Sequence, residues 1–217
     1  INAMLRTQPK MSFNGSTKEG WKLWRKTFRR QLLKNLGRFP DRVPLNPEIL
    51  ETSEEDGYRR ERVVFDSERF ASVPAYVFVP NDRKSGEKRS GILAAHGHGR
   101  GKIDVAGIAS SEKEYHQFIQ PLNYDYARKF VRKGYVVIAP DWRCFGEREP
   151  DHGWVRDSRD MCNVSYPAYG YFGYHMLTLN IWDGMRTLYY RERLPGFAAS
   201  RIGMVGLSFG GTMTTYL

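Results

Sequence analysis

The segment Gly206-Leu207-Ser208-Phe209-Gly210-Gly211 has residue types and spacing suited to nucleophilic catalysis. A serine with glycine two residues before and two residues after it is typical of a sharp, strained turn from a strand into a helix. Such a corner leaves no room for side chains at the flanking positions, which explains Gly206 and Gly210. The start of a helix favours developing negative charge. We therefore predict that Ser208 is a nucleophile and that the Phe209 N–H stabilises an oxyanion.

A second glycine-rich loop, His96-Gly97-His98-Gly99, directly follows the apolar segment 91–95. An acyl-transfer oxyanion needs at least two N–H donors, and a loop after an earlier strand can supply one of them. We expect this donor to be the N–H of His98 or of Gly97. Other interpretations stay open: a metal pair of His96 and His98, which lacks matching ligand spacing elsewhere; a phosphate cradle, which lacks the usual glycine motifs; and a plain tight turn.

The segments that must position these two loops alternate between apolar runs and amphipathic stretches. Strands are predicted at 58–65, 73–79, 91–95, 135–140 and 202–205, and helices at 122–133, at 176–193 and from Phe209 onward. Residues 41–57 are expected to form a loop, and residues 141–175 an irregular segment of the kind that forms a lid or pocket wall. This alternation indicates an α/β fold with a mostly parallel sheet and helices on both faces.

The N-terminal part contains one strong helix signal. A capping box at residues 16–19 precedes apolar residues at spacings of three and four, and Gly37 closes the pattern. The aromatic and basic residues occupy different faces, so we interpret the helix as packing its aromatic stripe on the main domain rather than stacking it on nucleic-acid bases. We predict residues 1–57 as a tail with an amphipathic helical extension and residues 58–217 as the main domain.

The composition excludes several classes of protein. The chain has 217 residues, of which 41% are hydrophobic and 27% charged, so fibrous and disordered proteins are excluded. No apolar run approaches the roughly 18 residues of a membrane helix and no secretory signal is visible, so we expect a cytoplasmic protein with no membrane partner. The net charge of +10 is interpreted as a solvated basic face, and nucleic acid is not expected as a partner. The cysteines, Cys144 and Cys162, allow at most one disulfide.

Residues 58–217 resemble the α/β-hydrolases, specifically the dienelactone-hydrolase-like and acetyl-xylan-esterase-like branch. The matching segments are His96-Gly97-His98-Gly99, the strand 135–140 with the following Asp-Trp-Arg-Cys-Phe-Gly at 141–146, Arg-Ile-Gly at 201–203, and the elbow at 206–211. The family often has glycine where this chain has Cys144, so we expect the local backbone geometry to differ. The resemblance implies an α/β-hydrolase fold and a triad of serine, acid and histidine in that chain order.

The triad implied by this resemblance is incomplete. Nine residues follow Ser208, and none is Asp, Glu or His. The order places both partners downstream, so the chain is expected to be truncated after the elbow. The upstream candidates for the acid and the histidine violate that order, and each has a structural explanation. These candidates are Asp141, Asp183, His116, His152 and His175.

These observations favour a serine hydrolase that cleaves a small-molecule carboxylic ester, including an acetyl ester or lactone, through an acyl-enzyme at Ser208. No cofactor and no metal are expected, and the sequence does not indicate an oligomeric state. Two alternatives stay open. One is a serine peptidase of the prolyl-oligopeptidase kind, which shares the elbow. The other is a non-catalytic binding protein that uses the basic N-terminal helix.

Overall fold

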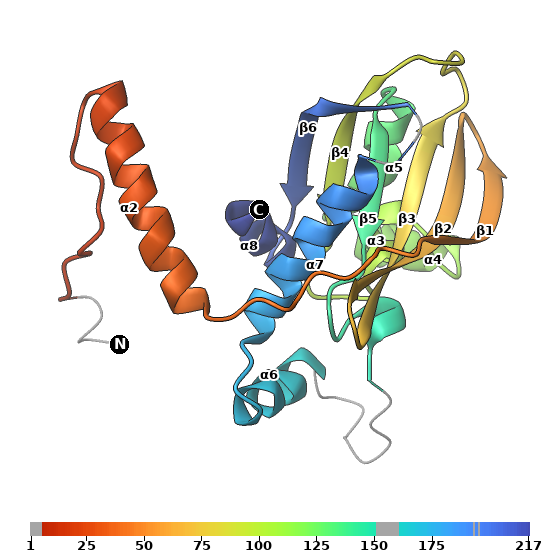
Figure 1. Ribbon diagram of the computed structural model, residues 1–217. Coiled ribbons are helices and arrows are strands. Elements are labelled where there is room, and N and C mark those ends of the chain that lie inside the picture. Colours follow the sequence, from red (N-terminus) through yellow and green to blue (C-terminus); the bar gives the residue numbers. More distant parts are fainter. Residues whose placement is uncertain (1–5, 151–160, 193, 195) are drawn as a thin grey trace. The chain divides into compact units, whose positions relative to one another are not determined.

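The computed structural model describes residues 6–150, 161–192, 194 and 196–217. The chain forms two compact units, Ile1–Arg38 and Phe39–Leu217. A six-stranded sheet in the order β1-β2-β3-β5-β4-β6 is the centre of the second unit (Figure 1). Its strands are β1 Glu48–Glu55, β2 Tyr58–Glu68, β3 Ala71–Pro80, β4 Arg89–Ala95, β5 Val136–Pro140 and β6 Phe197–Gly206.

The sheet is mixed rather than mostly parallel. Strand β4 pairs in parallel with β5 and with β6, so that Ile92 lies opposite both Val137 and Gly203. The pairings β1·β2, β2·β3 and β3·β5 are antiparallel. Only two residues separate β1 from β2 and β2 from β3, and only antiparallel neighbours can be joined so tightly. The predicted parallel arrangement therefore holds for β5-β4-β6, the part of the sheet that carries the glycine-rich loops.

Strand β1 corrects the expectation of a loop at residues 41–57. Its sequence, Glu-Ile-Leu-Glu-Thr-Ser-Glu-Glu, is acidic and mostly exposed, and it forms the edge of the sheet. Charged residues are usual on edge strands because they discourage pairing with other chains. They also explain why the strand could not be predicted from an alternation of apolar and polar residues. The boundary predicted at 57/58 falls between two paired strands, and the compact unit begins at Phe39.

Helices cover both faces of the sheet (Figure 1). Those of the second unit are α3 Lys102–Ala106, α4 Glu112–Glu114, η1 Tyr115–Ile119, α5 Tyr126–Arg132, η2 Gly146–Arg148, α6 Met161–Tyr171, α7 Met176–Arg191 and α8 Phe209–Tyr216. Ala127 and Val131 of α5 pack against one face, in the same cluster as Val137. On α7, the Tyr190 ring stacks on Phe65 with 4.7 Å between centroids. Neighbouring strand residues point to opposite faces, so each face receives its own apolar layer.

Two local predictions differ from the structure. Helix α6 lies within the segment expected to be irregular, and it contains Pro167; residues 151–160 of that segment lie outside the described part of the chain. Cys144 has φ 72°, the left-handed region that glycine favours. The chain thus makes this turn without glycine and carries the strain instead.

The N-terminal unit contains the predicted helix. Helix α2 spans Lys18–Leu36, and the Thr17 side chain caps it by accepting a hydrogen bond from the Gly20 N–H. The Trp24 ring contacts those of Phe13 and Phe28, with centroids 5.4 and 5.0 Å apart. Part of the aromatic stripe therefore packs within this unit. No helix in the described ranges is long and apolar enough to cross a membrane.

Candidate active site

The corner between β6 and α8 holds Ser208 in a rare backbone conformation. Its φ and ψ are 55° and −120°, and it is the residue that immediately precedes α8. A non-glycine residue in this region costs about 1–3 kcal/mol of strain, which persists only where the surroundings enforce it. Ser208 is exposed, and the first N–H groups of α8 begin at Phe209. The corner therefore presents a hydroxyl group beside backbone donors.

Glycines around this corner are required by close backbone contacts. A Cβ atom at Gly206 would lie 2.2 Å from the carbonyl carbon and oxygen of Gly210, and one at Gly210 would lie 1.9 Å from the Ala95 carbonyl oxygen. A Cβ atom at Gly97 would lie 3.1 Å from that of Ser208. The ends of β4 and β6 are paired neighbours, so the elbow and the His-Gly loop approach each other backbone to backbone, with no space for side chains.

The side chain of His96 anchors the first residues of the His-Gly loop. Its side chain is fully buried, with Nδ1 2.7 Å from the Gly97 carbonyl oxygen. Nε2 accepts a hydrogen bond from the Trp142 backbone N–H at 3.0 Å, and the Trp142 indole N–H donates to the His96 carbonyl oxygen at 3.2 Å. Both ring nitrogens are thus engaged within the protein, and burial lowers the pKa of the imidazole. This supports a structural role for His96 over a metal pair, and the described residues contain no group of three metal-ligating side chains.

Tyrosines support the same loop from its other side. The Gly97 N–H donates to the Tyr124 hydroxyl at 2.6 Å, and the Tyr126 hydroxyl donates to the Ala95 carbonyl oxygen at 2.5 Å. Burial raises the pKa of Tyr124 to about 12, so its hydroxyl stays neutral. This hydrogen bond occupies the Gly97 N–H, one of the two groups expected from the sequence as an oxyanion donor. Sequence reasoning missed Tyr124, because no local pattern links it to residue 97.

An aromatic cluster lies beside Ser208. The His98 ring lies 5.3 Å from the Phe145 ring and 5.5 Å from the Phe209 ring, and the two phenylalanine rings are 5.9 Å apart. Phe145 is buried, whereas Phe209 is half-buried. Because Phe209 directly follows Ser208, the cluster places apolar surface next to the serine, and apolar surroundings strengthen electrostatic interactions. Phe145 was not singled out in the sequence, although it lies within the Asp-Trp-Arg-Cys-Phe-Gly segment.

The upstream acids considered for a triad have structural partners. Asp141 is fully buried against Lys102, with 2.6 Å between Oδ2 and Nζ. Asp183 is fully buried with Arg143 and Arg148, each at 2.8 Å. Burial by itself would raise the pKa of Asp183, but the two guanidinium groups hold it below its ordinary value. Both carboxylates are thus engaged in ion pairs, and their places, directly after β5 and within α7, are those expected from the sequence.

The upstream histidines are placed as follows. His116 is exposed, and its Nδ1 lies 2.5 Å from the Gln120 side-chain oxygen. His175 is exposed and precedes α7. His152 lies outside the described residues.

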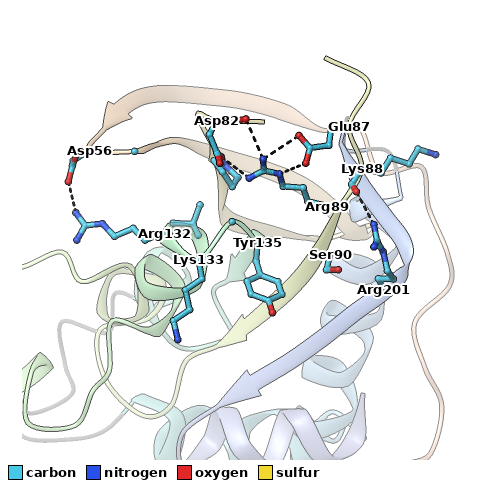
Figure 2. A pocket seen from close by; sticks show the side chains of 14 residues that line it. Asp56, Asp82, Glu87, Lys88, Arg89, Ser90, Arg132, Lys133, Tyr135 and Arg201 are labelled. Carbon is cyan, nitrogen blue, oxygen red and sulfur yellow. Dashed lines mark hydrogen bonds and ion pairs between the residues drawn. The ribbon is translucent and has the colours of Figure 1, made fainter. Parts of the chain in front are cut away.

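A hollow of about 950 Å³ lies at the amino ends of β4 and β5, and Figure 2 shows side chains that line it. It is bordered by the first residues of β4 and by the turn before β5, whereas Ser208 follows the carboxyl end of β6. Arg89 points at two carboxylates there, with Asp82 at 2.7 Å and Glu87 at 2.9 Å. Arg201 donates to the Lys88 carbonyl oxygen. The three acidic side chains of this hollow are paired with Arg89 and Arg132, and the hollow is separate from the candidate active site.

Known proteins share this architecture. The chain is 27% identical over 191 residues to the provisionally named hydrolase YtaP of Bacillus subtilis (strain 168), which covers 85% of this chain and 56% of that protein. A provisionally assigned acetyl xylan esterase from Bacteroides fragilis NCTC 9343 has a TM-score of 0.82 at 22% identity, over 99% of this chain and 55% of that one. A glucuronoyl esterase from Solibacter usitatus has a TM-score of 0.57 at 15% identity, over 93% and 56%.

The likeness to the solved structures confirms the α/β-hydrolase fold that the sequence resembles. This chain spans about half the length of the relatives it matches. A family model described as "Abhydrolase family" matches residues 1–211, which include the elbow and the His-Gly loop. The chain therefore belongs to the Abhydrolase family.

Proposed function

We propose that Ser208 is the nucleophile of a serine hydrolase that cleaves carboxylic esters. The observation that carries this proposal is the conformation of Ser208, a strained and exposed residue directly before α8. Strain of this kind is retained where it serves a function. Ser208 also lies at the start of a helix and is exposed, which distinguishes it from the buried Cys144, the strained residue of the loop after β5.

The reaction follows from the groups around the elbow. The Ser208 hydroxyl oxygen forms a bond to the ester carbonyl carbon while a general base takes its proton. The carbonyl electron pair moves onto oxygen, where the N–H groups of Phe209 and His98 stabilise it. Collapse of this intermediate breaks the bond to the alcohol, which leaves with the proton. Water then attacks the acyl-serine by the same route, releasing the acid and restoring the hydroxyl.

The named relatives favour an ester over a peptide substrate. The two solved structures that resemble this chain are named as an acetyl xylan esterase and a glucuronoyl esterase. Both names specify hydrolysis of a carboxylic ester. A small ester also suits an exposed serine beside the rings of Phe209 and His98.

The test uses the full-length protein and a fluorophosphonate probe, which labels activated serines. We expect labelling of Ser208 alone, and Ser208→Ala is expected to lower turnover of short p-nitrophenyl esters by several orders of magnitude, about 10⁶-fold in a known serine hydrolase. Ser200→Ala is the matched control, because Ser200 is also exposed on β6 and outside the elbow. Unchanged turnover in Ser208→Ala, or labelling of another serine, rejects the proposal.

The same experiment separates the alternatives. Faster turnover of aminoacyl-proline amides than of esters would identify a peptidase. No labelling, together with salt-dependent binding to nucleic acid, would identify a binding protein that uses basic helix α2.

A further inference from the structure

The carboxylate of Asp141 is the shared anchor of two loops. Asp141 directly follows β5 and is fully buried. It accepts hydrogen bonds from the Lys102 backbone N–H at 2.7 Å, from Lys102 Nζ at 2.6 Å and from the Glu147 backbone N–H at 3.1 Å. Lys102 lies three residues after Gly99, the last residue of the His-Gly loop, and Glu147 belongs to the segment after β5. One side chain thus joins segments about 40 residues apart in the sequence.

Two glycines enclose this carboxylate. Gly101 and Gly146 have φ of 85° and 57°, in the left-handed region. A Cβ atom at Gly101 would lie 2.4 Å from Asp141 Oδ1, and one at Gly146 would lie 2.5 Å from the same oxygen. Both loops therefore wrap around the carboxylate at a distance that no other residue type allows.

Lys102 contributes a buried cation to the same anchor. Its side chain is 1% exposed, and its ammonium group contacts Asp141 and, at 2.5 Å, the Glu147 carboxylate. It also lies 5.0 Å from the centre of the Tyr76 ring. A buried ammonium group is strongly unfavourable without such partners. The pairing therefore holds Lys102 in one position, and with it the end of the His-Gly loop.

We propose that Asp141 and Lys102 are positioning residues that hold the His-Gly loop in the geometry needed to stabilise the oxyanion. The loop is then fixed at both ends: His96 bonds to Trp142 at its start, and Lys102 bonds to Asp141 at its end. The inference rests on the proposed function, because it assigns the His98 N–H to the oxyanion. Both side chains are buried, so their effect is transmitted through the backbone of residues 97–101.

This role predicts a particular kinetic signature. An oxyanion forms only in the transition state, so a displaced donor lowers kcat while KM stays the same. Loss of one oxyanion donor costs about 10²–10³-fold in kcat, and a displacement of about 1 Å costs about 10²-fold. Asp141→Asn, which places an amide where the two lysine donors and the Glu147 N–H converge, is therefore expected to lower kcat about 10- to 100-fold.

The test measures kcat, KM, thermal stability and fluorophosphonate labelling of Ser208 in the full-length protein. Asp141→Asn leaves the buried Lys102 ammonium with the partly exposed Glu147 carboxylate as its ion-pair partner and destabilises the fold, so the double variant Asp141→Asn/Lys102→Met removes both buried charges. We expect the double variant to regain thermal stability relative to Asp141→Asn while kcat stays low. Glu147→Gln, at a side chain that is 38% exposed, removes the negative charge of one Lys102 partner and is expected to lower kcat several-fold.

Arg89→Met is the matched control. This substitution removes the ion pairs of Arg89 with Asp82 and Glu87 (Figure 2). The Arg89 side chain is 16% exposed, and Arg89 is the first residue of β4, at the end of the strand away from the His-Gly loop. The substitution is expected to lower thermal stability with kcat unchanged. The proposal is overturned if the double variant and Glu147→Gln have the kcat of the unaltered protein, or if their effect is confined to KM. If the unaltered protein is not labelled at Ser208, the proposed function fails instead, which distinguishes the two outcomes.

Discussion

Replacing Gly210 by alanine tests whether the elbow is held by backbone contact with β4. The added Cβ atom would lie 1.9 Å from the Ala95 carbonyl oxygen and 2.9 Å from that of His96. Carbon and oxygen normally approach to about 3.2 Å at closest, so α8 must move away by about 1 Å or more. Overpacking of this degree costs about 3 kcal/mol, only partly offset by the better helix propensity of alanine, about 1 kcal/mol.

The neighbouring glycine supplies the control. A Cβ atom at Gly211 would lie 3.5 Å from the Gly206 carbonyl oxygen, which is ordinary contact, and Gly211 is also in α8. Gly211→Ala is therefore expected to be neutral or to stabilise by up to about 1 kcal/mol. Urea denaturation gives the free energy of unfolding of both variants, and the rate of fluorophosphonate labelling at Ser208 reports on the geometry of the elbow. Gly210→Ala is expected to be labelled about 10²-fold more slowly. Equal stability and equal labelling of the two variants would refute this account of the corner.

Two more predictions concern the support of the His-Gly loop. Tyr124→Phe leaves the buried Gly97 N–H without its acceptor, so we expect the free energy of unfolding to fall by about 1–3 kcal/mol in urea denaturation; no change would mean that the hydrogen bond contributes nothing. Burial lowers the pKa of His96 below 6.5, and Asp141, 3.9 Å away, offsets only part of this. The unfolded chain therefore binds a proton that the native chain does not, and stability falls by up to about 1.4 kcal/mol per pH unit as the pH drops below 6.5. His96→Gln should remove this slope, and an unchanged slope would contradict the assignment.

Local physics explains why the elbow and several elements were visible in the sequence. Gly206 is required by its contact with Gly210, four residues further along, so the spacing around Ser208 is a local signal of the strained corner, although Gly210 itself is required by its contact with Ala95 of β4. Helix α2 has its own cap and its own apolar period, and both are properties of neighbouring residues. Strand β1 has neither signal, because its residues are mostly exposed and acidic. Its pairing with β2 was decided by the turn at Asp56-Gly57 and by the edge that β2 presents.

The amino-acid sequence by itself determined the fold family, the candidate nucleophile and the presence of a second glycine-rich loop. The tertiary structure decided how that loop is held. Tyr124 lies 27 residues from Gly97, and Asp141 lies 39 residues from Lys102. Contacts at such separations depend on how β4, β5 and β6 are ordered in the sheet, and no local periodicity records that order. The loops that supply the backbone N–H donors of the site can therefore be predicted from the sequence. The buried groups that position these loops are found only in the folded structure.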